Sequence, residues 1–319
     1  MTDAPALPPH VGETIVTVGT FDGVHRGHQD VLASLAERGR ASGRASVLVT
    51  FEPHPLEVVN PAAAPRLLTP GAEKLEVLAE AGLDYVAVVP FTRTMAALDA
   101  AQFVDLVLRE RFRMSELLMG YDHGFGRGRS GDVETLRAIG AERGIPVDVV
   151  PAVLTPDGHP ISSTFIRRAV AGGDLAHAAT ALGRPYSISG RVAAGAGRGR
   201  DLGFRTINVP LESPRKLLPP EGVYAVRVQT PRGPFGGMMN LGGRPTFGEA
   251  TVVLEAHLFD VDADLYGQWV RVDVLGWLRA IRRFDGPAAL VAQLRADEAS
   301  ARALLVGMAG GGRDPQRAG

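Results

Sequence analysis

Two histidines three positions apart open the most chemically informative segment of the sequence. His25 and His28 lie in the run 19–28, GTFDGVHRGH, which follows an apolar run and precedes a helical pattern. At the start of a helix, both imidazoles share one face and lie among backbone N–H groups without partners inside the helix. That helix end attracts phosphate, and Gly27 lets a nucleotide approach the backbone. The segment predicts nucleotidyl transfer by positioning and charge stabilisation, for which no covalent intermediate is needed. For the histidine pair alone, a helix cap or surface feature is the alternative.

A second expected helix start carries hydroxyl groups and a guanidinium. The run 161–167, ISSTFIR, places Ser162, Ser163 and Thr164 where they cap a helix, with Arg167 one turn further on. Together they suit the β- and γ-phosphates of a nucleotide. For this run alone, an ordinary capped helix is the alternative. Two such helix starts in one α/β domain favour the phosphate interpretation.

Two further segments are candidates for the walls of a ligand pocket. The run 51–55, FEPHP, ends a strand with prolines around His54, and is either a rigid turn or a wall of the nucleotide or acceptor pocket. The run 120–131 has too much glycine for regular structure. In it, Asp122 is a candidate hydrogen-bonding partner for an acceptor, and Phe125 a candidate surface for a ring. A solvated loop is the alternative for that run.

The second half of the sequence offers candidates for a metal site and a general base. Thr206 and Asn208, two apart on an expected strand, point the same way and supply the hard oxygen ligands that Mg²⁺ takes. Glu255 is a candidate base for deprotonating a hydroxyl that attacks a γ-phosphate. Exposed strand residues are the ordinary alternative for all three. The nearby run 190–205 is rich in glycine and arginine but lacks the Gly-Lys-Ser/Thr ending of a P-loop.

These segments need elements that position them, and the first half supplies an α/β pattern. Strand patterns at 14–18, 46–51, 85–89, 116–119 and 147–150 alternate with helical patterns at 29–40, 72–81, 101–112 and 133–143. The alternation predicts a Rossmann-like nucleotidyltransferase domain with a parallel sheet and helices on both faces. Ligands bind such sheets beyond the carboxyl ends of the strands, where the histidine- and glycine-bearing segments fall.

The second half changes to short alternating runs separated by glycine and proline. Strands are expected at 186–192, 206–209, 222–229, 238–241, 252–259 and 269–274, followed by a helix at 288–308. This predicts a small antiparallel β-barrel with a C-terminal helix. Trp269 and Trp277 are expected in its core. We predict domains at 1–182 and 183–309 and a disordered tail at 310–319.

Composition bounds the function classes. The chain has 319 residues, enough for about two domains, and a net charge of −1 that argues against nucleic acid or an anionic membrane as the main partner. It contains no cysteine, which excludes disulfides, thiolate catalysis and cysteine-ligated metals. No apolar run approaches the roughly 18 residues that span a bilayer, and the N-terminal run shows no signal-peptide pattern. A cytoplasmic enzyme acting on small molecules is expected, and its oligomeric state is not predicted.

Taken as a set, the motifs resemble the prokaryotic bifunctional riboflavin kinase/FAD synthetase family. The runs 19–29, 51–55, 161–167 and 182–186 occur in the order and spacing of that family. The second half continues the resemblance at 202–204, Thr206, Asn208, 222–224, 240–242, 244–247, 255–257 and 264–267. The resemblance covers about residues 13–305, nearly the whole chain.

The resemblance implies two reactions and a set of site residues. The N-terminal domain would join AMP from ATP to FMN, releasing pyrophosphate, and the C-terminal domain would make FMN from riboflavin and ATP. Mg²⁺ with ATP would be the cofactor, and riboflavin, FMN and FAD the substrates and products. The implied catalytic residues are His25, His28 and Glu255; the nucleotide-binding ones Gly19, Thr20, Phe21, Asp22, Gly27, Ser162, Ser163, Thr164, Arg167, Gly195, Gly197 and Gly199; the flavin-binding ones Phe51, His54, Asp122 and Phe125; and the metal ligands Thr206 and Asn208.

Three positions depart from the usual pattern of the family. Arg205 stands where proline usually precedes the magnesium threonine, Ile281 where an acidic residue is usual, and His123 where phenylalanine usually follows the aspartate. The alternative function is therefore an FMN adenylyltransferase with a weakened or inactive kinase domain. A different acceptor, such as nicotinamide mononucleotide or a cytidylyl substrate, leaves the second domain unexplained. An RNA-binding or flavin-sensing protein is disfavoured because the run 190–205 has few aromatic residues.

Overall fold

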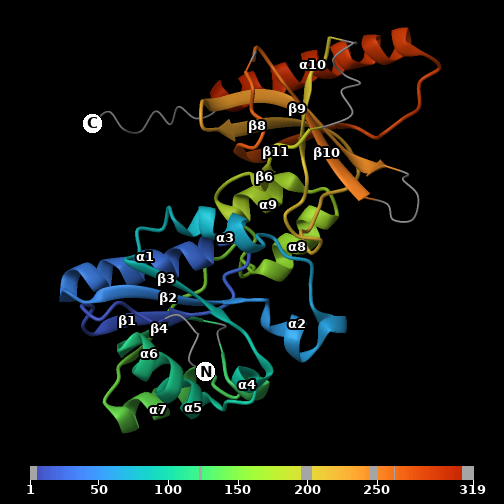
Figure 1. Ribbon diagram of the computed structural model, residues 1–319. Helices are drawn as coiled ribbons and strands as arrows, with labels where there is room; N and C mark the ends of the chain where they lie inside the picture. Colours follow the sequence, from blue (N-terminus) through green and yellow to red (C-terminus); the bar gives the residue numbers. More distant parts are fainter. Residues whose placement is uncertain (1–5, 122–123, 195–202, 245–250, 262, 311–319) are drawn as a thin grey trace. The chain divides into compact units, whose positions relative to one another are not determined.

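The computed structural model describes residues 6–121, 124–194, 203–244, 251–261 and 263–310. Contacts divide the chain into two compact units, Met1–Phe165 and Ile166–Gly319, called here the N-terminal and C-terminal units. Each has its own sheet (Figure 1). The predicted boundary at 182/183 stays a prediction.

The N-terminal unit is built on a five-stranded sheet in the order β3-β2-β1-β4-β5, in which every neighbouring pair is parallel. Its strands are β1 (Thr14–Val18), β2 (Ala45–Glu52), β3 (Tyr85–Pro90), β4 (Met114–Gly120) and β5 (Val147–Val150). The predicted parallel sheet is therefore confirmed. Because the order reverses beside β1, the end of that strand is a topological switch point, where open α/β sheets bind ligands.

Helices cover both faces of this sheet. The helices between residues 26 and 143 are α1 (Arg26–Ser42), α2 (Pro55–Val59), η1 (Pro61–Ala63), α3 (Gly71–Leu78), α4 (Arg93–Ala96), α5 (Ala100–Phe103), η2 (Val104–Arg109), α6 (Glu110–Phe112), η3 (Arg127–Arg129) and α7 (Val133–Arg143). Figure 1 shows α1 over one face and α6 and α7 over the other. Alternation along β1 explains this, since Val16 and Val18 belong to the core cluster that contains Phe103 and Phe112, whereas Ile15 packs with Leu35 of α1.

The predicted single helix at 101–112 is wound in three consecutive segments, α5, η2 and α6, of which η2 is a π-helix. Nine residues separate Phe103 from Phe112, about two and a half α-helical turns, which would point the two rings to opposite sides. The π-helix turns less per residue and brings both rings into the core, where they are 4% and 0% exposed.

The C-terminal unit contains a six-stranded antiparallel sheet in the order β6-β11-β8-β9-β10-β7. The strands are β6 (Tyr186–Arg191), β7 (Thr206–Val209), β8 (Gly222–Thr230), β9 (Gly233–Arg244), β10 (Thr251–Leu258) and β11 (Trp269–Arg279). The sheet is curled, and one backbone hydrogen bond joins its two sides: the N–H of Ala193, two residues beyond edge strand β6, donates to the Asn208 carbonyl of edge strand β7 at 2.8 Å. A curled antiparallel half-barrel of the predicted kind is present.

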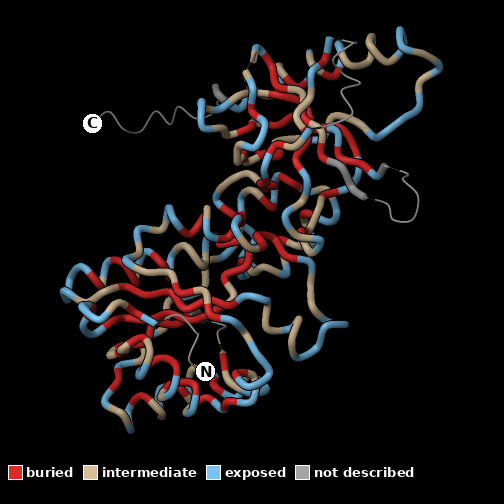
Figure 2. Tube along the Cα trace, viewed as in Figure 1, coloured by how far each residue is buried: buried red, intermediate tan, exposed pale blue. Residues whose placement is uncertain are grey.

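Three helices belong to this unit or lead into it, namely α8 (Ser163–Ala171), α9 (Leu175–Leu182) and α10 (Pro287–Gly310). The C-terminal helix α10 lies on the sheet through Ala301, Leu304 and Leu305. A Cβ on Gly236 would lie 2.7 Å from Leu305, and one on Gly276 would lie 2.6 Å from Leu304. Glycine at these two strand positions is thus what lets the helix approach the sheet. Figure 2 shows the buried backbone concentrated in the sheets of both units.

Trp277 corrects one expectation, because its side chain is 44% exposed rather than buried in the core. Strand β11 continues past an irregularity in its pairing with β8 at Val274/Gly276. Beyond it, Trp277 lies edge-on against Tyr224 and directly over Gly222. Trp277 lies beyond the predicted strand 269–274, and the regular alternation of buried and exposed side chains is interrupted at such an irregularity.

Candidate active sites

The loop that follows β1 is held in an unusual backbone conformation. Phe21, Gly23 and Val24 have φ values of 47°, 85° and 41°. A positive φ is costly for a β-branched residue such as Val24, which is 2% exposed. Strained residues of this kind persist where the surroundings hold them, and they cluster at functional sites.

Hydrogen bonds from the segment before α3 hold this loop. The Asp22 carboxylate accepts from the backbone N–H groups of Leu68, at 2.9 and 3.1 Å, and of Thr69, at 3.0 Å. The Thr69 hydroxyl in turn accepts from the Gly23 N–H at 2.8 Å. Asp22 is 3% exposed, so its role in the structure is to fix the loop. Gly19 is tied to the neighbouring strand by donating to Val49 O at 3.0 Å.

The two histidines lie together at the start of α1. His25 is the N-cap residue, and its Nδ1 accepts from the His28 N–H at 3.3 Å. The rings stack with centroids 3.7 Å apart and planes 16° apart, and the Phe21 ring lies 4.6 Å from His28. A Cβ on Gly27 would lie 3.3 Å from the His25 ring. The absence of a side chain at this position therefore leaves room for that ring. The predicted histidine pair is therefore a compact, preorganised group.

The second predicted phosphate motif meets the histidine loop. Ser163 donates from its hydroxyl to the Asp22 carbonyl at 2.8 Å. Ser162 caps α8 by accepting from the Phe165 N–H at 3.3 Å. Thr164 is exposed at the same helix start, and Arg167 follows on α8 as a half-buried residue of the C-terminal unit. The serines thus lie beside the histidine loop although about 140 residues separate the two segments.

A pocket opens at the carboxyl ends of β1 and β2. It is lined by Thr20, Asp22, Phe51, Glu52, His54, Leu67, Thr69 and Lys74. Four of these residues were predicted individually from the sequence and Glu52 lies in the predicted run 51–55, whereas Leu67, Thr69 and Lys74 were not predicted. The pocket lies at the carboxyl edge of the sheet, on the β2 side of β1, next to the switch point between β1 and β4.

The predicted flavin-binding residues differ in their surroundings. His54 caps α2, its Nδ1 accepting from the Leu56 N–H at 3.2 Å, while it also lines the pocket. Phe51 and Phe125 are 6% and 8% exposed and lie 6.2 and 5.0 Å from the Phe103 ring. Asp122 and His123 lie outside the described residues. The run 51–55 is accordingly both a rigid turn and a pocket wall.

Lys74 is the main residue of this pocket that the sequence patterns missed. Its side chain on α3 is buried, and burial lowers the pKa of its ammonium below the usual 10.5. The ammonium donates towards Thr50 Oγ1 and Phe51 O at 3.2 and 3.1 Å. The rarity of lysine in a chain rich in arginine is the signal that identifies it.

In the C-terminal unit, strand register brings the predicted kinase residues together. Glu255 of β10 is directly opposite Asn208 of β7, and His257 is opposite Thr206. Thr206, Asn208 and Glu255 therefore share one face of the sheet, with Asn208 9% exposed and Glu255 half-buried. The predicted glycines Gly195, Gly197 and Gly199 lie outside the described residues.

Two of the three departures from the family pattern, Arg205 and Ile281, lie within the described residues. Arg205 is exposed, and its carbonyl lies 2.7 Å from Nδ1 of His257, a contact that a proline at this position would retain. Ile281 is 46% exposed and lies against the backbone of Gly242, where a Cβ would be 2.4 Å from its Cδ1. Neither residue displaces Thr206, Asn208 or Glu255 from their shared face.

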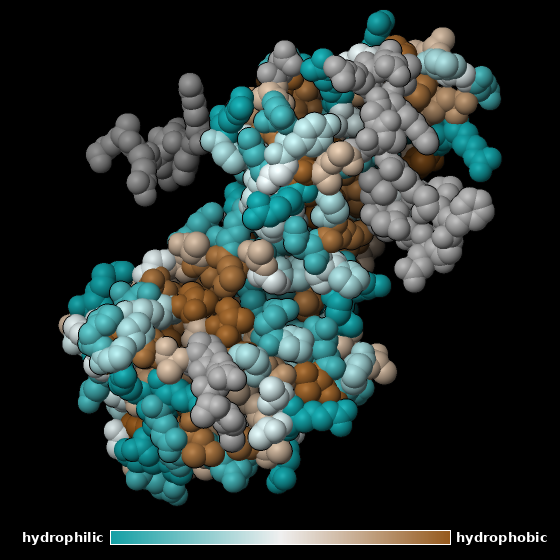
Figure 3. Space-filling model, viewed as in Figure 1, coloured by the Kyte–Doolittle hydropathy of each residue, from teal (hydrophilic) through white to brown (hydrophobic). Residues whose placement is uncertain are grey.

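Together these features define a two-unit transferase. A histidine pair at the switch point of a parallel sheet suits nucleotidyl transfer, and hard oxygen ligands beside a carboxylate suit phosphoryl transfer. Among the described helices none is long and apolar enough to cross a membrane, and hydrophilic residues cover much of both units on the face shown in Figure 3.

Comparison with known proteins gives the particular family. Residues 8–165 match the family model "FAD synthetase", and residues 182–305 match "Riboflavin kinase". The bifunctional riboflavin kinase/FMN adenylyltransferase of Escherichia coli (strain K12) is 43% identical over 289 residues, covering 90% of this chain and 91% of that protein. The protein of the same name from Bacillus subtilis (strain 168) is 32% identical over 294 residues, covering 91% and 92%. The chain belongs to the bifunctional riboflavin kinase/FMN adenylyltransferase family.

A solved structure agrees with this fold over nearly the whole chain. The crystal structure titled "Macrolide-efflux Protein from Streptococcus pneumoniae" is similar with a TM-score of 0.80 and 30% identity, covering 93% of this chain and 95% of that one. The family resemblance, the fold class and both enzyme activities predicted from the sequence are confirmed.

Proposed function

We propose that ATP, with Mg²⁺, is the phosphate donor in both reactions and that the predicted site residues carry them out. Adenylyl transfer would use His25, His28 and the helix starts of α1 and α8. Phosphorylation of riboflavin would use Thr206, Asn208 and Glu255. The single observation that carries the proposal is the meeting of separate motifs within each unit, shown by the hydrogen bond from Ser163 to Asp22 and by the register of Glu255 with Asn208.

In the adenylyl transfer, a phosphate oxygen of FMN forms a bond to the α-phosphorus of ATP. The bond from that phosphorus to the oxygen bridging to the β-phosphorus breaks, and pyrophosphate leaves with the electron pair. His25 and His28 donate hydrogen bonds to the α-phosphate oxygens, on which charge develops. The strained loop holds both rings in place before the substrate arrives, so little reorganisation is needed. Ser162, Ser163, Thr164 and Arg167 hold the leaving phosphates.

In the kinase reaction, the terminal ribityl hydroxyl of riboflavin attacks the γ-phosphorus of ATP, and ADP leaves. Glu255 accepts the proton of that hydroxyl. The donor set beside it suits Mg²⁺, because the Thr206 hydroxyl and the Asn208 amide oxygen are hard ligands on one face of a strand. Bound with ATP, this ion would neutralise charge on the transferred phosphate.

The proposal also keeps the cytoplasmic location and the small-molecule partners expected from the sequence. The competing candidate, an enzyme with a weakened kinase, is favoured only by Arg205 and Ile281. Since both lie at positions that leave the shared face of Thr206, Asn208 and Glu255 intact, we expect both steps to proceed.

The test uses purified full-length protein with two substrate mixtures. One contains riboflavin, ATP and Mg²⁺, the other FMN, ATP and Mg²⁺, and chromatography resolves riboflavin, FMN and FAD. FAD from both mixtures is expected, with no product when ATP or Mg²⁺ is omitted. FAD from the second mixture alone would support the weakened-kinase alternative.

A further inference from the structure

The chain has only two lysines among its 34 lysines and arginines, Lys74 and Lys216, and both are buried, with exposures of 5% and 3%. Lysine is almost never buried to this extent unless its charge is paired or hydrogen-bonded. The other basic side chains are arginines. A compact ammonium with three diverging donors fits between close acceptors where a planar guanidinium does not. These two positions therefore require lysine rather than arginine.

The Lys74 ammonium joins the carboxyl ends of two neighbouring strands. It lies 3.1 Å from Phe51 O and 3.2 Å from Thr50 Oγ1 on β2, and 3.5 Å from Thr20 O, two residues beyond β1. Thr20 begins the loop that carries the histidines. Lys74 therefore links the wall of the pocket to the loop on which adenylyl transfer depends.

The charges around Lys74 give the pocket a defined electrostatic character. Two carboxylates, Asp22 and Glu52, interact with the ammonium, and the His54 imidazole also lines the pocket. The Asp22 carboxylate already accepts from the backbone of Leu68 and Thr69, and Glu52 is exposed to solvent. A buried positive charge in a pocket that is also lined by Thr20 and Thr69 suits a phosphate monoester.

We propose that Lys74 is a positioning residue for adenylyl transfer, which fixes the ends of β1 and β2 and directs the phosphate of the acceptor FMN into this pocket. The inference rests on the proposed function of the N-terminal unit. Lys74 takes no proton and forms no bond in the reaction. Its effect is on where the attacking phosphate is held.

The test compares Lys74→Met with Lys216→Met, the matched buried lysine of the other unit. Rates of FAD formation are measured with FMN varied at saturating ATP and with ATP varied at saturating FMN. Lys74→Met is expected to raise KM for FMN at least tenfold and to change KM for ATP less than twofold. The same preparation should phosphorylate riboflavin within twofold of wild type. Lys216→Met should leave KM for FMN unchanged.

A pH profile of the wild type supplies a readout that needs no variant. Burial lowers the pKa of Lys74 below 10.5, the usual value for lysine. As the pH increases through this lowered pKa, the ammonium loses its charge and KM for FMN should rise. Lys74→Met should lack that rise. An unchanged KM for FMN, an equal rise in KM for ATP, or a pH dependence that persists in the variant would overturn the assignment. A wild-type protein that makes no FAD from FMN and ATP would instead overturn the proposed function.

Discussion

At the scale of single residues, the cap of α1 determines which nitrogen of His25 carries the proton when the ring is neutral. Nδ1 accepts the His28 N–H, so a neutral ring carries its proton on Nε2 and can donate from there. His54 has the same arrangement, with Nδ1 accepting from Leu56. In both cases the backbone fixes the tautomer of an imidazole beside the pocket or the histidine loop.

His28→Ala removes one of the two proposed donors to the α-phosphate. Loss of one such donor costs about 10²- to 10³-fold in kcat, so FAD formation from FMN should fall by at least about 100-fold. Riboflavin phosphorylation should be unaffected, because it uses the other unit. Chromatographic assays of both steps check this, with His177→Ala as the control at an exposed histidine of the C-terminal unit. Loss of both activities in folded protein would contradict the two-site assignment.

Glu255→Gln should have the opposite effect. The amide keeps the shape of the side chain but cannot accept a proton, and loss of a general base costs about 10²- to 10⁴-fold. FMN formation from riboflavin should fall by that factor while FMN adenylylation continues at the wild-type rate. Glu212→Gln, at an exposed glutamate of the same unit, is the matched control. A variant that still phosphorylates riboflavin at the wild-type rate would show that Glu255 is not the base.

At the scale of elements, hydrophobic periodicity was sufficient to predict the order and kind of nearly every strand. Strands β1 and β5 and helix α7 have the predicted bounds. Strand β9 is longer than the predicted strand at 238–241. The prediction was too short because Gly236 and Gly237 have no side chain that contributes to the hydrophobic pattern. These glycines are required by packing against α10 and β10, which is tertiary information.

The candidate sites were predictable where a motif had its own spacing. The spacings of His25 with His28 and of Thr206 with Asn208 are visible in the sequence. Lys74 is not part of such a motif, since its partners are two backbone carbonyls and a threonine hydroxyl supplied by other segments. Contacts to backbone groups depend on where strands end in space, and no pattern of residue types encodes them.

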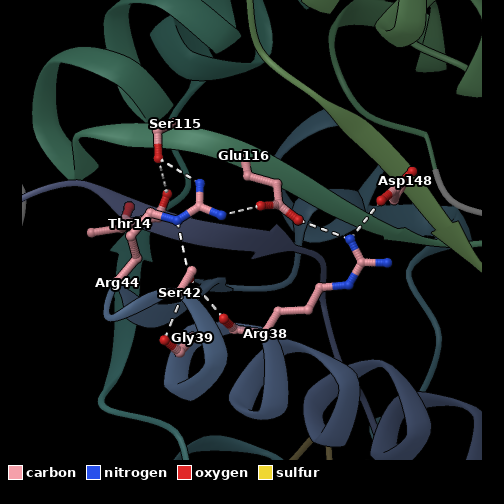
Figure 4. A network of polar contacts seen from close by, with 8 residues as sticks. All are labelled: Thr14, Arg38, Gly39, Ser42, Arg44, Ser115, Glu116 and Asp148. Carbon is pink, nitrogen blue, oxygen red and sulfur yellow. Dashed lines mark hydrogen bonds and ion pairs between the residues drawn. The ribbon is translucent and has the colours of Figure 1, made fainter.

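A buried ion-pair network stabilises the sheet of the N-terminal unit. Glu116 of β4 is 7% exposed and accepts from Arg44 and, at 2.8 Å, from Arg38 of α1 (Figure 4). Glu116→Gln should lower the free energy of unfolding by about 1–2 kcal/mol, because both arginines are partly exposed and solvent screens their charges. Denaturant unfolding measures this.

Asp148→Asn provides the comparison for that network. Asp148 also pairs with Arg38, but its side chain is 52% exposed, so its loss should cost less than about 1 kcal/mol. Equal destabilisation by the two changes would contradict the importance of burial at Glu116.

Asp273 should make the stability of the C-terminal unit depend on pH. Burial raises the pKa of its carboxyl above the usual 3.8, against the opposing effects of Gln229 and Arg271. The fold therefore favours the protonated acid. The contribution of Asp273 to the free energy of unfolding is fully present below pH 3.8 and is lost as pH rises through the raised pKa. Relative to Asp273→Asn, wild-type thermal stability should fall as pH rises from about 4 towards neutrality. Parallel profiles of the two proteins would refute this.

At the scale of the whole molecule, each unit has its own core, and the two reactions are proposed to use different residues. The cluster around β1, β2 and α5–α6 and the cluster under α10 share no residue. A defect in one site should therefore be complemented by a second molecule. An equal mixture of His28→Ala and Glu255→Gln proteins should convert riboflavin and ATP to FAD after a lag, although neither variant does so alone. The absence of FAD from the mixture would mean that FMN does not reach a second molecule.

The backbone hydrogen bond between Ala193 and Asn208 lies next to the proposed kinase site and can be followed by amide exchange. The peptide carbonyl that accepts from Ala193 belongs to Asn208, the residue whose side chain is the proposed magnesium ligand. Solvent deuterium can replace the Ala193 amide proton only when that bond opens. The exchange rate of one backbone amide therefore records how tightly the ligand strand is held, and occupancy of the site by Mg²⁺ and nucleotide would slow it.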